Sequence, residues 1–324
     1  MGTLILRRFL YSIPLLLLGS LILFWAVRTT DTFDPTARLA QSRDRTVVQQ
    51  ERERLGLDDP IMVQYGNWLG DFVTGDFGES SRTREDVSSM IQRAFGNTLQ
   101  LIVWGVLLSS IVAMSIGVYS AVKQYSFGDY LFTGLSYVGI AMPPFFFAYL
   151  AIHYIAVEPI QWFNLDSAPL KFVGLHSAGQ SGFNWDYVQH LILPVMTLTV
   201  QIVASWTRFQ RAATLDVLSS DYIRTARAKG VPRRTVILRH GVRNSLIPLV
   251  TVMAVDIGLL FGGLIITEFI FNIPGMGKLF YDALLNGDAP VILAWMMVSG
   301  VFILVFNLLA DVLYGVLDPR VRVS

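Results

Sequence analysis

Six long stretches of the sequence contain almost no charged residue, and this pattern limits the fold more than any other feature. A membrane-spanning helix needs about 20 mostly apolar residues, because the hydrocarbon core is about 30 Å thick and each helical residue rises about 1.5 Å. Across all six stretches the ionisable side chains are Asp256 and His153. The sequence therefore predicts an all-α polytopic protein with six transmembrane helices. These cover residues 9–27, 98–122, 130–157, 191–207, 245–267 and 291–310.

The composition argues against most other classes of protein. Hydrophobic residues make up 53% of the chain and charged residues 15%, whereas soluble domains average about 45–50% and about 25%. There is no cysteine, and the four histidines lie far apart and match no metal-ligand spacing. The formal net charge of +1 gives no overall field that would attract a polyanion. We therefore expect no metal, no cofactor, no catalytic group and no nucleic-acid partner.

The basic residues indicate the orientation in the membrane, because Lys and Arg accumulate in short cytoplasmic loops. If the spans alternate in direction, four groups of basic residues lie on the same side of the membrane. They are those before the first span, between spans two and three, between spans four and five, and after span six. The first span is longer than the apolar core of a signal peptide and is not followed by a small-x-small cleavage site. We therefore expect an uncleaved first helix and cytoplasmic termini. The residues concerned are Arg7, Arg8, Lys123, the Lys and Arg of 208–243, Arg320 and Arg322.

The expected loop at residues 28–97 is too long for a simple connection and would lie outside the cytoplasm. Residues 46–58 are rich in good helix formers, and an apolar stripe at helical spacing then ends near Gly75. This predicts a short amphipathic helix. It either lies at the membrane interface and packs on the helix bundle, or helps to dock an external partner. The stripe consists of Ile61, Tyr65, Trp68, Leu69 and Phe72.

The loop between spans four and five predicts a short, tightly bounded helix over residues 219–230. Ser219 or Ser220 can cap its N-terminus, where Asp221 adds a favourable charge. Gly230 can close its C-terminus in the left-handed conformation, and Pro232 can open the next helix. Two interpretations stay open, a protein-docking element or a re-entrant hairpin held against lipid headgroups by arginines.

This loop resembles the cytoplasmic signature of ABC-importer permeases, in the subgroup that serves peptides and nickel. The match is Asp221-Tyr222-Ile223-Arg224-Thr225-Ala226-Arg227-Ala228-Lys229-Gly230, followed by Arg243-Asn244 and Pro248. Further motifs in the same order extend the resemblance over nearly the whole chain. They are Leu55-Gly56-Leu57-Asp58, Gly75-Asp76-Phe77-Gly78, Asn97-Thr98-Leu99, Pro143-Pro144, Pro274-Gly275-Met276-Gly277 and Asp318-Pro319-Arg320.

The resemblance implies the first, or B-type, permease subunit of an ATP-driven, binding-protein-dependent importer in the plasma membrane of a prokaryote. Its partners would be a second homologous permease, two cytoplasmic ATPase subunits, an extracytoplasmic substrate-binding protein and the lipid bilayer. The chain itself would not be an enzyme, because it lacks a Gly-x-x-x-x-Gly-Lys-[Ser/Thr] phosphate loop. Dipeptides or oligopeptides are the first choice of substrate, and nickel chelates or another small solute stay open.

The competing class is an ion-coupled secondary transporter. That class would require inverted repeats and intramembrane ion relays, and the sequence displays neither. The resemblance also implies four parts of the chain. They are a first helix at 1–27, an extracytoplasmic segment at 28–97, a permease core with five helices at 98–318, and a cytoplasmic tail at 319–324.

Two sets of residues are candidates for function. The short helix between spans four and five would be a coupling helix that docks on an ATPase. The candidates for the pathway or its gate are Pro143, Pro144, Asp256 and Glu268. The expected docking residues are Ser220, Asp221, Tyr222, Arg224, Thr225, Ala226, Arg227, Ala228, Lys229 and Gly230.

The pathway candidates each have an alternative role. An isolated charge in mid-membrane costs at least about 2.5 kcal/mol, so Asp256 either lines the pathway or hydrogen-bonds to the sister subunit. Glu268 would contribute to a gate or outer-loop contact, or cap the turn that precedes Pro274. The prolines, including Pro194, would break helices where a cavity uses the freed carbonyls, or would be packing kinks.

Overall fold

The computed structural model describes residues 2–33, 36, 45–54 and 56–317, and the regular structure in these residues is helical except for one β-bridge between Glu79 and Asp86. The expected tail at 319–324, with its arginines and the Asp318-Pro319-Arg320 motif, lies outside the described residues. The chain forms two compact units. The first is Leu99–Ile273 with Val305–Ser324, and the second is Gly2–Thr98 with Pro274–Leu304.

Within the described residues, five helices are long and apolar enough to cross a membrane, in agreement with five of the six predicted spans. The helix of span four is longer than its apolar stretch, and the helix of span five begins before its apolar stretch, as Pro232 predicted. Four of these helices are α1 (Gly2–Thr29), α4 (Val87–Val122), α8 (Trp185–Ser219) and α14 (Ala289–Leu317). The fifth is continuous over three labelled elements, which are α10 (Arg233–Thr235), the π-helical η4 (Val236–Val242) and α11 (Arg243–Gly263).

The third predicted span is not one straight helix. It breaks between α5 (Phe127–Ala141) and α6 (Pro144–Ala151), and its two halves are bent by 108°. The proline pair lacks backbone N–H groups, and Met142 before it has the extended conformation that a following proline favours (φ −82°, ψ 120°). Pro194, in contrast, remains inside α8, so of the two alternatives stated for it the helix break does not occur and the packing kink stays open. After α6 come the π-helical η3 (Ile152–Val157) and α7 (Glu158–Trp162).

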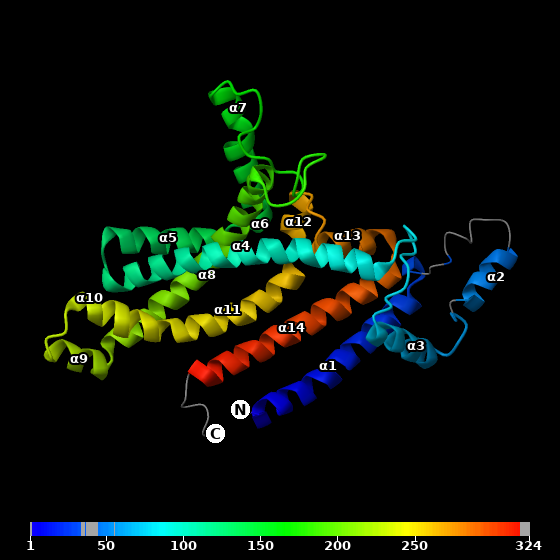
Figure 1. The fold of residues 1–324 in the computed structure, drawn as a ribbon, viewed down its shortest axis with the longest axis horizontal. Coiled ribbons are helices and arrows are strands. Elements are labelled where there is room, and N and C mark those ends of the chain that lie inside the picture. Colours follow the sequence, from blue (N-terminus) through cyan, green and yellow to red (C-terminus); the bar gives the residue numbers. More distant parts are fainter. Residues whose placement is uncertain (1, 34–35, 37–44, 55, 318–324) are drawn as a thin grey trace. The chain divides into compact units, whose positions relative to one another are not determined.

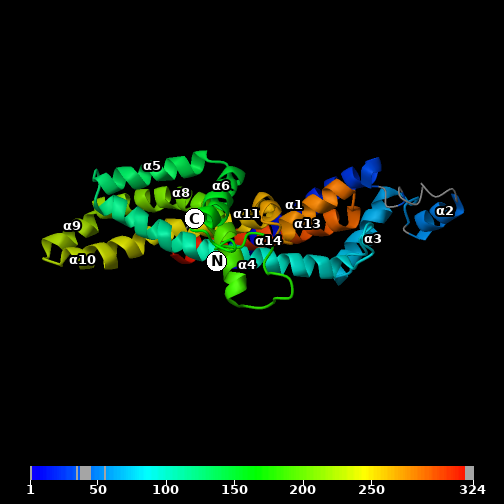
Figure 2. The same cartoon turned by 90° about the horizontal axis from the view of Figure 1, so that it is seen from above.

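The first unit is built around α8, which packs against α5, α6, α11 and α12 (Ile265–Ile270). Small residues bring the helices close together. A Cβ placed at Gly105 or Gly117 of α4 would lie 2.4 Å from Leu198 Cδ2 or 2.7 Å from Gln210 Cβ, both on α8. Such small-residue contacts are typical of helix packing in membranes. Figure 2 shows α5 running alongside α8.

The second unit contains the predicted amphipathic helix, α3 (Ile61–Thr74), which Gly75 ends in the left-handed conformation (φ 87°). The rings of Tyr65 and Trp68 lie 5.6 and 5.4 Å from that of Phe24 on α1, and the Tyr65 hydroxyl lies 2.8 Å from that of Ser20. The stripe therefore packs on a spanning helix. The unit also contains η1 (Asp31–Phe33), α2 (Arg45–Arg54) and α13 (Met276–Asn286).

Candidate functional site

The predicted short helix is present as α9 (Asp221–Ala228), and Figure 1 shows it at the end of α8 that is farther from α6. Ser220 occupies the N-cap position, but its hydroxyl accepts no hydrogen bond from an N–H of α9. It donates instead to the Val217 carbonyl at 2.5 Å, and the Ser219 hydroxyl donates to the Asp216 carbonyl at 2.8 Å. The predicted side-chain cap is therefore wrong, because both hydroxyls are directed back to carbonyls of the preceding helix. Gly230 has φ 78°, and the Val231 N–H donates to the Ala226 carbonyl at 3.2 Å, which confirms the predicted C-terminal closure.

One residue of α9 points inward and most of the others are exposed. Ile223 is fully buried, and the Asn244 amide at the start of α11 donates to the Tyr222 hydroxyl at 3.0 Å. These contacts hold α9 against its own unit. Of the expected docking residues, Ser220 and Ala226 are half-buried, and the remaining eight are exposed. The predicted residues thus form one accessible surface, which we call the α9 face.

Buried polar contacts join α8 to α11 close to α9. The Gln210 side chain donates to the hydroxyls of Ser245 at 2.9 Å and Thr214 at 3.0 Å, and the two hydroxyls are 3.1 Å apart. All three residues are fully buried. Since unsatisfied buried polar groups are costly, these contacts fix the spacing of the two helices that flank α9.

An ion pair between half-buried Arg211 and buried Asp129 joins α8 to α5, and sequence reasoning missed it. Arg211 donates from Nε and Nη2 to the two carboxylate oxygens of Asp129, at 2.9 and 3.0 Å. Asp129 lies in the first turn of α5, where its backbone N–H donates to the hydroxyl of Ser126 at 3.3 Å. The capping serine was a visible sequence signal, but no local pattern linked Asp129 to a residue 82 positions away.

Asp256 on α11 has a partner that the sequence did not predict. Its carboxylate accepts a 2.6 Å hydrogen bond from the indole N–H of Trp206 on α8, and that indole is fully buried. The bond therefore lies within the chain and joins the two helices on either side of α9. Asp256 itself is only partly buried.

The other pathway candidates lie in different surroundings. Pro143 and Pro144 form the break between α5 and α6, whereas Glu268 on α12 is fully buried. The turn before Pro274 is closed by the backbone, since the Ile273 N–H donates to the Glu268 carbonyl at 2.8 Å. This bond uses the main chain of Glu268 and not its carboxylate.

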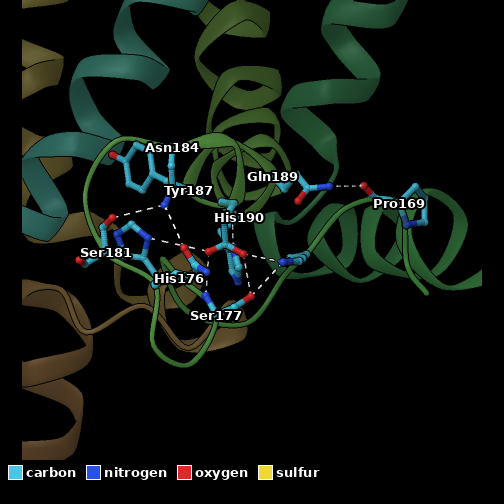
Figure 3. Close-up of polar contacts among 11 residues, drawn as sticks. Pro169, His176, Ser177, Ser181, Asn184, Tyr187, Gln189 and His190 are labelled. Atoms are coloured by element: carbon cyan, nitrogen blue, oxygen red, sulfur yellow. Dashed lines mark hydrogen bonds and ion pairs between the residues drawn. The ribbon is translucent and has the colours of Figure 1, made fainter. Parts of the chain in front are cut away.

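A polar cluster fastens the loop at 163–184 to the first turn of α8 (Figure 3). The Asp186 carboxylate accepts from the backbone and hydroxyl of Ser177, at 2.8 and 2.7 Å, and from Lys171 Nζ at 2.5 Å. The ring of His176 stacks on that of Tyr187, with centroids 5.2 Å apart. Within the described residues, no group of three or more His, Asp or Glu side chains is arranged to hold a metal.

The sequence match to known proteins agrees with this arrangement. The family model described as the inner membrane component of binding-protein-dependent transport systems matches residues 113–323, which include α9. The chain belongs to this family. The matched region covers α8, α9 and α11, the three helices that the buried contacts join.

Similar proteins match this family member over its whole length. The oligopeptide transport system permease protein AppB of Bacillus subtilis is 39% identical over 327 residues, covering 99% of this chain and 100% of that protein. The oligopeptide transport system permease protein OppB of Mycobacterium tuberculosis is 37% identical, with 98% of both chains covered. The dipeptide transport system permease protein DppB of Alkalihalophilus pseudofirmus is 34% identical, again with 98% of both covered.

Proposed function

We propose that this chain is the transmembrane permease subunit of an ATP-driven importer of peptides and forms half of the translocation pathway. The observation that carries the proposal is α9, a short exposed helix held between two spanning helices and lying within the region that the family model matches. Peptides are the proposed substrate because the similar permeases are named for oligopeptide and dipeptide transport.

The proposed partners follow from the family. A second homologous permease would complete the pathway, two ATPase subunits would drive transport, and an external binding protein would deliver the peptide. Both termini and α9 would be cytoplasmic, in the plasma membrane of a prokaryote. The α9 face, with Arg224, Arg227 and Lys229, would fit a groove on one ATPase subunit that carries complementary charge.

The connections of α9 explain how ATP hydrolysis could move the spanning helices. A single residue, Ser220, separates α8 from α9, and residues 229–232 connect α9 to α10. Because neither connection is long enough to act as a flexible linker, a displacement of α9 would be passed to α8 and α11. The importer would alternate between two states, and the binding of ATP would favour one of them.

The test is a charge reversal on the α9 face. The variant R224E/R227E is co-expressed with its partner subunits, purified in mild detergent and examined for bound ATPase. We expect loss of the ATPase subunits, because two exposed cations become anions at the proposed contact. The control is R82E, which reverses one charge at an exposed position of the other unit and should retain them. Retention of ATPase and of ATP-driven peptide uptake by R224E/R227E would refute the proposed docking surface.

A further inference from the structure

The Asp129–Arg211 pair is arranged to fix the orientation of two helices. Its two N–H···O bonds run from different guanidinium nitrogens to different carboxylate oxygens, and such a bidentate pair is more specific in geometry than a single contact. The carboxylate also accepts from the Tyr125 backbone N–H at 3.0 Å, and Asp129 is only 2% exposed. The turn before α5 and the first turn of α5 are thus held to one point on α8.

Stability alone is a weak reason for such a pair. The pair removes the Asp129 carboxylate from water, whereas the Arg211 side chain stays 28% exposed, and ion pairs of this kind often add little net stability. Elsewhere the same two helices meet through small or aromatic contacts. A Cβ at Gly139 would lie 3.0 Å from the Cβ of Ala204, and the Arg208 guanidinium lies 5.6 Å from the ring centroid of Tyr137.

The position of the pair relates it to α9. The contacts at Gly139–Ala204 and Asp129–Arg211 indicate that α5 and α8 run antiparallel, with the ion pair at the end that leads to α9. Ten residues of α-helix would extend about 15 Å, and Arg211 precedes the start of α9 by that many positions. The covalent chain joins α9 only to α8 and to α10–α11, so α5 needs a non-covalent connection to follow it.

We propose that Asp129 and Arg211 are a positioning pair for energy coupling, through which a movement of α9 reaches the bent span α5–α6. The inference rests on the proposed function, since it requires that an ATPase moves α9. The Gln210–Ser245 contact fastens α11 to α8 in the same region, and the ion pair adds α5. Three spanning segments then respond to one displacement.

The test measures how many peptides enter per ATP hydrolysed. The complete transporter, with its partner subunits and binding protein, is reconstituted in liposomes with D129N, R211Q or R211K. We expect D129N and R211Q to retain their ATPase subunits and to hydrolyse ATP within about twofold of the wild-type rate. Peptide uptake per ATP should fall at least fivefold in both, and R211K, which keeps the charge but not the bidentate contact, should give an intermediate value. The control K278Q removes a more exposed ion pair with Asp282 and should keep the wild-type ratio.

A crosslink distinguishes a positioning role of the Asp129–Arg211 pair from a role in folding. The chain has no cysteine, so D129C/R211C can be joined after reconstitution by a short bifunctional thiol reagent. We expect the crosslink to restore uptake per ATP in the same folded protein. An unchanged ratio in D129N and R211Q, or no restoration by the crosslink, would overturn the inference and leave the proposed function standing. No ATP-driven uptake by the wild-type complex would overturn both.

Discussion

The hydrogen bond between Trp206 and Asp256 permits a quantitative test of how α8 and α11 are joined. The donor is fully buried and the 2.6 Å distance is short for N–H···O. An interhelical hydrogen bond between side chains of a membrane protein contributes about 0.6 kcal/mol on average and up to about 1.7 kcal/mol. Since 1 kcal/mol shifts Tm by about 2–4 °C for domains of this order of size, removing this interaction should lower Tm by roughly 1–7 °C.

The measurement is a double-mutant cycle of W206F, D256L and W206F/D256L in detergent, with Tm followed by intrinsic fluorescence. W206F leaves a carboxylate without its indole donor, and D256L leaves a buried N–H without its acceptor. We therefore expect the double variant to be less destabilised than the sum of the two singles, by about 0.6–1.7 kcal/mol. Additivity within about 0.5 kcal/mol would refute the reasoning. D256N, whose amide oxygen can still accept, should retain part of the stability.

Three further predictions concern single residues. Gly230→Pro should abolish co-purification of the ATPase subunits, because Pro requires φ near −65° where Gly230 has 78°; the same change at Gly179, also at φ 78° but in the loop at 163–184, should leave the ATPase bound. Gly117→Ala should destabilise the protein by about 1–3 kcal/mol, since its Cβ would lie 3.0 Å from the Thr207 carbonyl oxygen, whereas Gly134→Ala, which meets nothing within 4 Å, should not lower Tm. Asp186→Asn should loosen the loop at 163–184, seen as faster amide exchange at Ser177, whose N–H donates to Asp186, while the exposed Asp166→Asn should have no effect.

The spanning helices and α9 could be predicted from the sequence because their signals are local. A charge-free stretch of about 20 residues predicts a spanning helix from its length alone. Gly230 predicts a left-handed end of the helix, whatever the conformation of the chain that follows. The proline pair likewise marked the break in the third span. The Ser220 cap failed because the direction of the hydroxyl depends on the carbonyls at the end of the preceding helix, which a local pattern does not describe.

The contacts that join the helices could not be predicted in this way. Trp206 and Asp256 lie 50 positions apart, and Asp129 and Arg211 lie 82 apart. The sequence around each of these residues does not indicate which helix will pack beside its own helix. The sequence indicated that Asp256 needs a partner, because a lone charge in a membrane is costly, but the identity of that partner depends on the register between α8 and α11.

The close packing of α4 and α5 on α8 restricts the kind of motion available to the first unit. Sliding α8 along α4 would move Leu198 and Gln210 away from Gly105 and Gly117 and against residues that carry side chains. We therefore expect α4 and α8 to move together and not to slide past one another. The break at Met142–Pro143 offers the alternative, since the ladder of helical hydrogen bonds is interrupted there. We expect the rotation that opens this half of the pathway to occur as a hinge at that dipeptide.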